Sequence, residues 1–231
     1  FIACSLTGFN DLHCFTNHCF DPSSNRRCAT HQILLKDRAR SNQKQNGNKE
    51  ENEVHQMQQL MLQRPVWVSD VKTLDDAYEM MLVVGEMVGR SEKAGEIVSG
   101  IKSSFSEKKN KFSSNILNNE ASAAYLIWRN PYLTIGSDTF INAMLEIAGF
   151  KNVFADAVRY PEISVDDLAL RAPQYILLAS EPYPFRQKHA EELQPLLPAS
   201  KMVLVDGEMF SWYGSRLLKA ADYFGELREL L

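Results

Sequence analysis

The stretch SEKAGEIVSGIKSSFSEKKNKFSSNIL (residues 91–117) predicts one long helix. Its apolar side chains recur every three or four residues and form a single stripe: Ala94, Ile97, Val98, Ile101, Phe105, Phe112 and Ile116. Ser91 is expected to cap the first turn. At 1.5 Å per residue the helix is roughly 40 Å long, and it therefore exceeds the usual helix of a globular protein.

The residues before this helix predict further regular structure. Residues 54–63 have helical spacing of apolar side chains, and residues 65–68 (PVWV) are typical of a short strand. Thr73 and Asp76 have the spacing of a capping box. They open a helix that runs to about Val88, where Gly89 can end it.

The residues after the long helix alternate between strands and helices. Strands are expected at 123–128, 175–179 and 202–206. Helices are expected from Ser137 or Asp138 to Ile147, from Ser164 to just before Pro173, within 184–196, and over 215–231. Such alternation favours an α/β fold with a mostly parallel sheet.

Composition sets limits on the class of protein. The chain has 231 residues, 45% hydrophobic and 23% charged, which excludes a wholly disordered or collagen-like chain. Its formal net charge is −4. The chain therefore lacks the excess of positive charge that drives nonspecific binding to nucleic acids, and no nucleic-acid partner is expected. No apolar run of about 18 residues predicts a membrane-spanning helix.

All four cysteines lie near the start of the chain, at Cys4, Cys14, Cys19 and Cys28. Three interpretations are open: a zinc site that adds His13 and His18, disulfides in one of three connectivities, or a segment with neither function. The last is favoured. The polar run at residues 37–53 cannot bury enough apolar surface to offset the entropy of ordering, so this part of the chain is expected to be poorly ordered.

The chain lacks the common catalytic signatures. Gly95 and Gly100 have the spacing of a phosphate-binding loop, but Ile101 stands where that motif requires Lys. There is no G-x-S-x-G, H-E-x-x-H or G-x-G-x-x-G. The one histidine after residue 55, His189, stands among charged residues and is expected at the surface. We therefore expect no enzyme activity, no catalytic residue, no cofactor and no metal site.

Three loops that follow predicted strands or helices combine aromatic side chains with arginine. They are Trp128 to Tyr132, Arg159 to Glu162, and Phe210 to Arg216. Loops at the carboxyl ends of parallel strands form ligand sites in open α/β sheets. An aromatic face can stack on a flat ligand, and the fork of an arginine can bind an anionic group. The alternative is that the two tryptophans only pack at the edge of the core, but three such loops favour a shared ligand face.

The segments Ile127 to Phe154, Tyr160 to Pro182 and Gly207 to Phe224 carry a family resemblance. They resemble the second lobe of periplasmic substrate-binding proteins of the cobalamin and iron-siderophore type, the helical-backbone metal receptors. NKEENE at residues 48–53 and PVWVSDVKTLDDAYEMM at residues 65–81 resemble the end of the first lobe. The resemblance covers about Asn48 to Leu231.

The resemblance implies an α/β fold of two lobes bridged by one long helix. The strand, Pro-Ser turn and helix with which the family's first lobe opens have no match in residues 1–47, so the first lobe is expected to be incomplete. The resulting division is an atypical segment at 1–47, a remnant of the first lobe at 48–90, the connecting helix at 91–117, and the second lobe at 118–231.

The resemblance also implies capture of a small molecule rather than catalysis. Such proteins hold cobalamin, a ferric siderophore or haem between their lobes and deliver it to the permease of an ABC importer. On this chain the ligand face would include Trp128, Arg129, Tyr160, Trp212 and Arg216. Glu181 or Glu162 would dock on the transporter. The chain is expected to be a monomer in the periplasm, or anchored outside the cytoplasmic membrane, although no complete signal peptide is present in the sequence.

Two other functions stay open on the sequence alone. A degenerate paralogue would keep the lobe and its protein partner but bind no chelate. An enzyme of the chelatase or nitrogenase-like type would need metal ligands or an acid–base pair, and after residue 55 the chain has neither Cys nor paired His.

Overall fold

The computed structural model describes residues 2–7, 11–14, 66–116 and 121–231. The chain is divided into two compact units, Phe1–Asp70 and Val71–Leu231. The helix predicted at residues 54–63, Cys19 and Cys28, and most of the segment predicted to be poorly ordered lie outside the described residues. The four-part division drawn from the sequence stays a prediction.

The first unit contains a three-stranded antiparallel sheet in the order β2-β1-β3. Its strands are β1 (Ile2–Thr7), β2 (Asp11–Cys14) and β3 (Val66–Ser69). The strand predicted at residues 65–68 is confirmed as β3. In the register of β1 and β2, Cys4 lies opposite Cys14.

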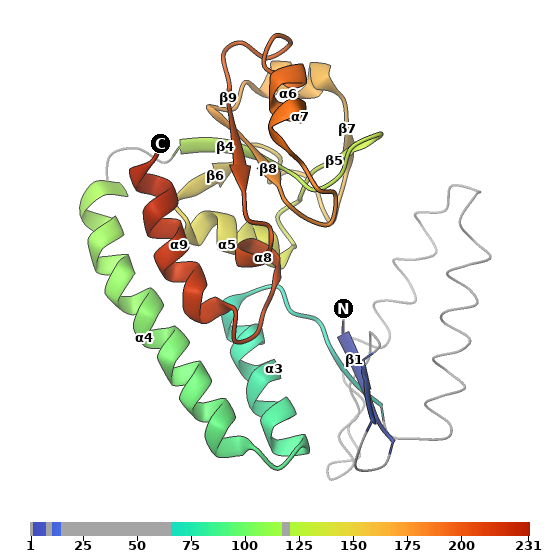
Figure 1. The fold of residues 1–231 in the computed structure, drawn as a ribbon, viewed down its shortest axis with the longest axis vertical. Coiled ribbons are helices and arrows are strands. Elements are labelled where there is room, and N and C mark those ends of the chain that lie inside the picture. Colours follow the sequence, from blue (N-terminus) through green and yellow to red (C-terminus); the bar gives the residue numbers. More distant parts are fainter. Residues whose placement is uncertain (1, 8–10, 15–65, 117–120) are drawn as a thin grey trace, which may run out of the picture. The chain divides into compact units, whose positions relative to one another are not determined.

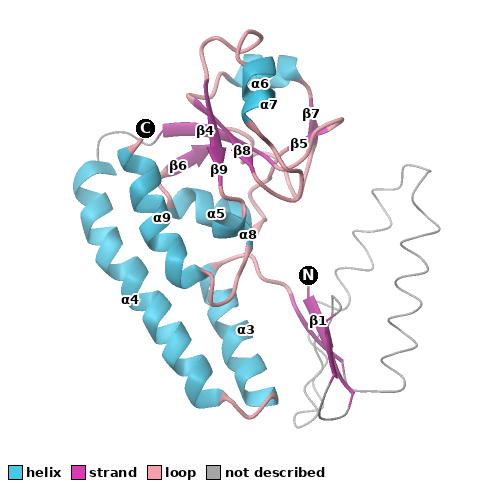
Figure 2. Ribbon diagram, in the orientation of Figure 1, coloured by secondary structure: helices cyan, strands magenta, loops and turns pink. Residues whose placement is uncertain are grey.

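The second unit is built on a parallel sheet in the order β6-β4-β8-β9 (Figures 1 and 2). These strands are β4 (Ala121–Leu126), β6 (Phe150–Asn152), β8 (Tyr175–Ala179) and β9 (Lys201–Val205). The accompanying helices are α5 (Phe140–Ile147), α6 (Val165–Arg171), α7 (Gln187–Leu193), α8 (Glu208–Ser211) and α9 (Leu217–Glu229). The predicted α/β class and its parallel sheet are confirmed.

The predicted long helix is α4 (Ser91–Ile116), which packs against α3 (Leu74–Met87) and α9 (Figure 1). Ala94, Val98 and Ile101 of its stripe are buried. Ser91 is the first helical residue rather than the cap, so that detail of the prediction is wrong by one position. Helices α3 and α4 approach closely at Gly85, where an added Cβ would lie 2.3 Å from the Cβ of Ala94.

Two of the expected helix starts are capping boxes. Thr73 Oγ1 accepts the backbone N–H of Asp76 at 3.2 Å, and Asp76 accepts the backbone N–H of Thr73 at 2.8 Å. Ser164 and Asp167 make the same reciprocal pair at the start of α6. These short-range contacts depend only on spacing along the chain, which is why the sequence predicts them.

The expected cap of α5 is wrong, because Thr139 takes that position instead of Ser137 or Asp138. Thr139 Oγ1 accepts the backbone N–H of Asn142 at 3.2 Å. The carboxylate of Asp138 is engaged elsewhere, since it accepts the backbone N–H of Arg159.

The two faces of the parallel sheet carry separate cores. One face of β4 and β8 packs against α5, α8, α9 and the helices α3 and α4. The other face packs against α6 and α7. Phe210 and Phe224 are fully buried in the first core, and Leu168 in the second. This burial on both faces fixes the sheet and therefore fixes where its strands end.

Candidate functional site

The carboxyl ends of β4, β8 and β9 lie at one edge of the parallel sheet. The segments that leave this edge are residues 127–133, 180–186 and 206–216. Two of the three aromatic-and-arginine loops predicted from the sequence are among them. Because parallel strands end together, segments that are far apart in the chain leave the sheet at this edge.

Trp128 leaves the end of β4 with 40% of its surface exposed. Its ring lies edge-on to the ring of Tyr183, with centroids 5.7 Å apart. The backbone N–H of Tyr183 donates to the carbonyl of Ile127 at 3.2 Å, which ties the loop after β8 to the loop after β4. The tryptophan is therefore supported on one edge while much of the ring stays accessible.

Arg129 points to α7 rather than into free solvent. Its Nη2 lies 2.5 Å from Oε2 of Glu192, and its Nε is buried without a hydrogen-bond partner among the described residues. The sequence predicts Arg129 as the fork that binds an anionic group. In the structure an anion would have to compete with Glu192 for it.

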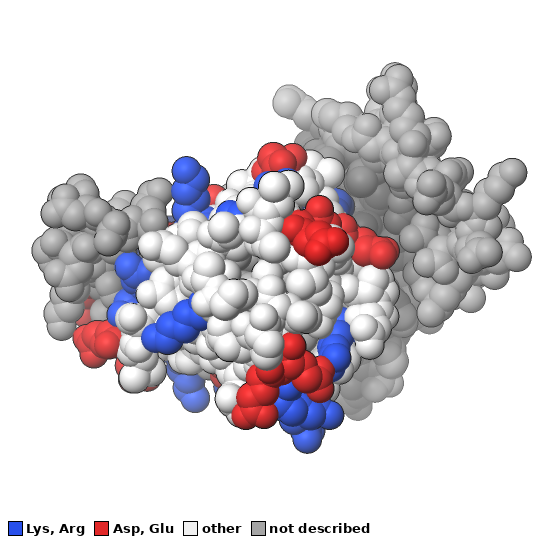
Figure 3. All heavy atoms as spheres, turned by 90° about the horizontal axis from the view of Figure 1, so that it is seen from above, with Lys and Arg blue, Asp and Glu red and all other residues white. Residues whose placement is uncertain are grey.

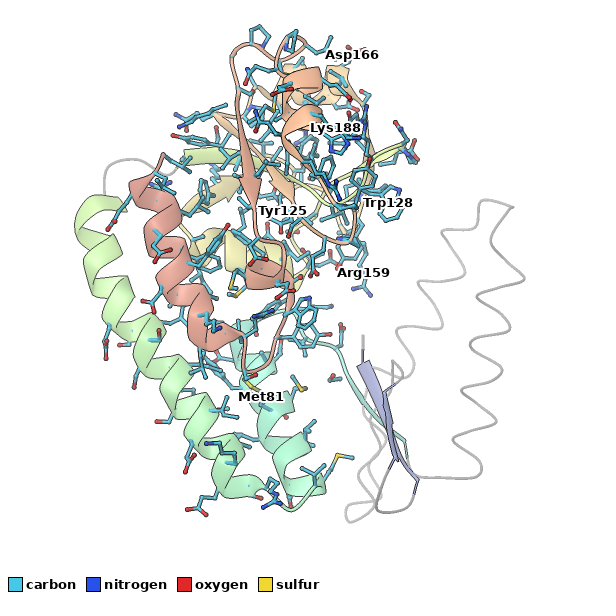
Figure 4. The ribbon with its side chains drawn as sticks, in the orientation of Figure 1. Met81, Tyr125, Trp128, Arg159, Asp166 and Lys188 are labelled. Carbon is cyan, nitrogen blue, oxygen red and sulfur yellow. The ribbon has the colours of Figure 1, made fainter. Side chains whose placement is uncertain are left out.

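Tyr160 lies on the strap 157–161, which pairs with residues 134–137. The backbone N–H of Thr134 donates to the carbonyl of Pro161 at 3.1 Å, and that of Gly136 to the carbonyl of Arg159 at 2.7 Å. Tyr160 is 47% exposed. Figure 4 shows Arg159 on the same side of this unit as Trp128.

Trp212 and Arg216 lie together after β9. Trp212 ends α8 and is 51% exposed. The Arg216 guanidinium carbon lies 5.8 Å from the centroid of the indole ring, and the guanidinium forms an ion pair with Glu208. The structure thus brings these two predicted ligand residues into contact, which the sequence spacing of four residues allows but does not require.

The two carboxylates predicted to dock on a transporter occupy different places. Glu181 follows β8 directly, and its Oε1 accepts Nε1–H of Trp212 at 2.5 Å. Glu162 is exposed in the short strand β7 (Glu162–Ile163), which pairs with β5 (Tyr132–Leu133). Glu181 is therefore a partner of Trp212, whereas Glu162 lies in the β5–β7 pair.

His189 is buried, with only 4% of its surface exposed, so the prediction that it lies at the surface is wrong. Its Nδ1 accepts the backbone N–H of Arg186 at 3.0 Å, at the start of α7, and its Nε2 lies 3.4 Å from the Tyr183 hydroxyl. Its ring also packs edge-on against Phe185. The neighbouring residues Arg186 and Lys188 are exposed, whereas the imidazole of His189 packs against Tyr183.

Burial, followed by the positive charge of Arg129, lowers the pKa of His189 below its ordinary value. Below about pH 6.5 the unfolded chain binds a proton at this position before the folded chain does. We therefore expect the free energy of unfolding to decrease as the pH falls through this range. Urea unfolding at about pH 7.5 and about pH 5.5 should show a smaller decrease in His189→Gln than in the wild type. Equal decreases in the free energy of unfolding of the two proteins would contradict this role of His189.

The described residues offer no metal site and no membrane span. No group of three or more His, Cys, Asp or Glu among them could hold a metal ion. No helix among them is long and apolar enough to cross a membrane. Figure 3 shows charged side chains of both signs scattered over the described surface in that view, separated by uncharged area.

The prediction from the sequence did not include Tyr183, Glu192 or Glu208, which are partners of the predicted site residues. Tyr183 had a usable signal, because it stands in a loop directly after a strand. Glu192 had none, since it becomes a partner of Arg129 only when α7 packs beside the end of β4.

Known proteins resemble the chain in both sequence and fold. The model of the periplasmic binding protein family matches residues 43–195. The uncharacterized ABC transporter substrate-binding lipoprotein YvrC of Bacillus subtilis (strain 168) is 26% identical over 111 residues, which are 48% of this chain and 35% of that protein. The chain therefore spans about a third of the length of the curated relative it matches.

Two solved structures illustrate the shared fold. The periplasmic vitamin B12 binding protein BtuF of Vibrio cholerae is similar with a TM-score of 0.62 and 16% identity, over 78% of this chain and 69% of that chain. A periplasmic heme binding protein from Pseudomonas aeruginosa is similar with a TM-score of 0.63 and 16% identity, over 74% of this chain and 66% of that chain. At these identities the likeness shows the fold.

The parallel sheet and the long helix α4 are thus those of an α/β fold shared with these structures. The chain belongs to the periplasmic binding protein family.

Proposed function

We propose that this chain is the substrate-binding component of an ABC importer and captures a small metal chelate. The observation that carries the proposal is that three large aromatic side chains are exposed: Trp128 and Trp212, which follow β4 and β9 at the carboxyl edge of the parallel sheet, and Tyr160 on the strap 157–161. Flat macrocycles and catecholates can stack on exposed aromatic rings.

The chemical class of ligand is supported by the family and by the site. The similar structures include a vitamin B12 binding protein and a heme binding protein. The same aromatic face suits a corrinoid, haem or a ferric siderophore. Arg129 and Arg216 lie beside the tryptophans, where they can meet an anionic group of the ligand once they exchange their carboxylate partners.

The proposal is capture without chemical conversion, because the matching family consists of periplasmic binding proteins. The described part of the chain has no cluster of metal-ligating side chains, and its buried histidine is held by Arg186 and Tyr183. We propose Glu162 as the residue that docks on the permease, because its side chain is exposed while that of Glu181 is engaged by Trp212. Such a protein works outside the cytoplasmic membrane.

The proposal is tested by calorimetric titration of the full chain with cyanocobalamin, haem and a ferric hydroxamate, each against its metal-free counterpart where one exists. One ligand class should bind saturably, and mass spectrometry should recover it unchanged after incubation. Leu170→Ala serves as a control variant, since Leu170 is 85% exposed on α6 and lies outside the three loops. Conversion of the ligand, or no binding by a chain shown to be folded, would contradict the proposal.

A further inference from the structure

Glu181 lies where the ends of two neighbouring strands are joined. The backbone N–H of Gly207, after β9, donates to Ser180 Oγ, after β8, at 2.9 Å. The two segments are so close that a Cβ at Gly207 would lie 2.8 Å from Cγ of Glu181 and 3.0 Å from its carbonyl oxygen. The backbone that carries the Glu181 side chain is therefore tightly packed and has little freedom to move.

One oxygen of this carboxylate holds the end of α8. Oε1 of Glu181 accepts Nε1–H of Trp212 at 2.5 Å and lies 3.0 Å from the hydroxyl of Ser211. Hydrogen bonds to an ionised carboxylate are shorter and about twice as strong as neutral ones. Within residues 66–116 and 121–231 no cation forms an ion pair with Glu181, so the Trp212 indole is its main partner. The single hydroxyl proton of Ser211 is shared with the carbonyl oxygen of Gly207, which lies closer, at 2.8 Å.

The indole of Trp212 is also supported from one face. The Arg216 guanidinium lies over the ring, and its ion pair with Glu208, at the start of α8, holds it there. The polar edge of the ring is thus bound by Glu181 and one face is covered by Arg216. Half of the side chain remains exposed, so a ligand can stack on the accessible part of the ring.

We propose that Glu181 is a positioning residue that fixes the Trp212 indole as a preformed stacking surface. The inference rests on the proposed function and deepens it, because it assigns Glu181 to ligand capture through Trp212. A ring that is already held loses less freedom when a flat ligand stacks on it. Loss of the carboxylate should therefore weaken binding even though Glu181 itself need not touch the ligand.

The hydrogen bond is tested without any ligand. In the 15N-labelled full chain, the indole N–H resonance of Trp212, identified by its loss in Trp212→Phe, should lie downfield of an exposed indole. It should move upfield in Glu181→Ala and much less in Glu181→Gln, which keeps an acceptor oxygen. Glu96→Ala, on the exposed surface of α4, is the matched control and should leave it unchanged. An unmoved resonance in Glu181→Ala would overturn the inference.

The consequence for binding is tested with whichever of cyanocobalamin, haem or the ferric hydroxamate binds the wild type. Glu181→Ala should weaken binding by about fivefold, and Glu181→Gln should restore most of the affinity. In the Trp212→Phe background the same Glu181→Ala change should have less than about a twofold effect, because phenylalanine has no N–H to hold.

The outcomes separate this inference from the proposed function. An equal loss from Glu181→Ala in both backgrounds would show that Glu181 acts by another route and would overturn the inference. If none of the three probes binds the wild type, the proposed function fails, and the upfield shift alone then decides whether Glu181 orients Trp212.

Discussion

Trp212→Ala is expected to weaken ligand binding by about 30-fold, which corresponds to about 2 kcal/mol. The side chain is 51% exposed, its indole N–H is held by Glu181, and Arg216 supports one face of the ring. A large aromatic ring that is already fixed in position is the kind of residue that dominates the binding energy of a site. Calorimetric titration with the ligand that binds the wild type measures the change.

The control for this prediction is Leu170→Ala. Leu170 is also a large exposed apolar residue, but it lies on α6, away from the loops at the carboxyl edge. Its removal should change the affinity by less than about twofold. A loss of less than about threefold in Trp212→Ala, or equal losses in the two variants, would show that the ligand does not stack on Trp212.

Gly136→Ala is expected to lower the free energy of unfolding by about 3 kcal/mol, at the upper end of the effects of overpacking. A Cβ at this position would lie 2.5 Å from the carbonyl oxygen of Ala157 and 2.6 Å from Cα of Val158. Both are backbone atoms, so the methyl group cannot be accommodated by a side-chain rotation. The strap 157–161 would have to move away and lengthen the hydrogen bond from Gly136 N–H to Arg159.

Gly95→Ala is the matched substitution for Gly136→Ala. Gly95 lies in α4, and no atom within 4 Å would meet its added Cβ. Because alanine favours a helix over glycine by roughly 0.5–1 kcal/mol, this variant should be slightly more stable than the wild type. Urea unfolding of the two variants measures both changes, and a Gly136→Ala protein as stable as the wild type would contradict the packing of the strap.

The parts of the fold that follow from local sequence were predictable. The capping boxes at Thr73 and Ser164 depend on side chains three residues apart, and the buried positions of α4 follow its apolar stripe. The short strands β1, β2, β5, β6 and β7 were missed, as was α8. β6 consists of residues 150–152 and exists because Phe150 and Asn152 pair with β4 some 30 residues away, a register that no local pattern encodes.

The sequence predicted which types of residue form the candidate site, but not which of them pair with one another. Trp128 and Trp212 follow strand ends, and both are exposed there as the sequence suggests. Arg129 and Arg216 each meet a carboxylate, which depends on how α7 and α8 pack. His189 was misjudged because its neighbours in sequence are charged, whereas its burial is decided by Tyr183 and Phe185.

In the proposed function a ligand binds at the carboxyl edge of the parallel sheet. Hydrogen–deuterium exchange of the full chain, with and without the ligand that binds it, tests this directly. We expect slower exchange in residues 127–133, 180–183 and 207–216, and unchanged exchange in residues 165–171 and 194–200, away from that edge. Protection confined to the latter two segments, or no protection at saturating ligand, would contradict it.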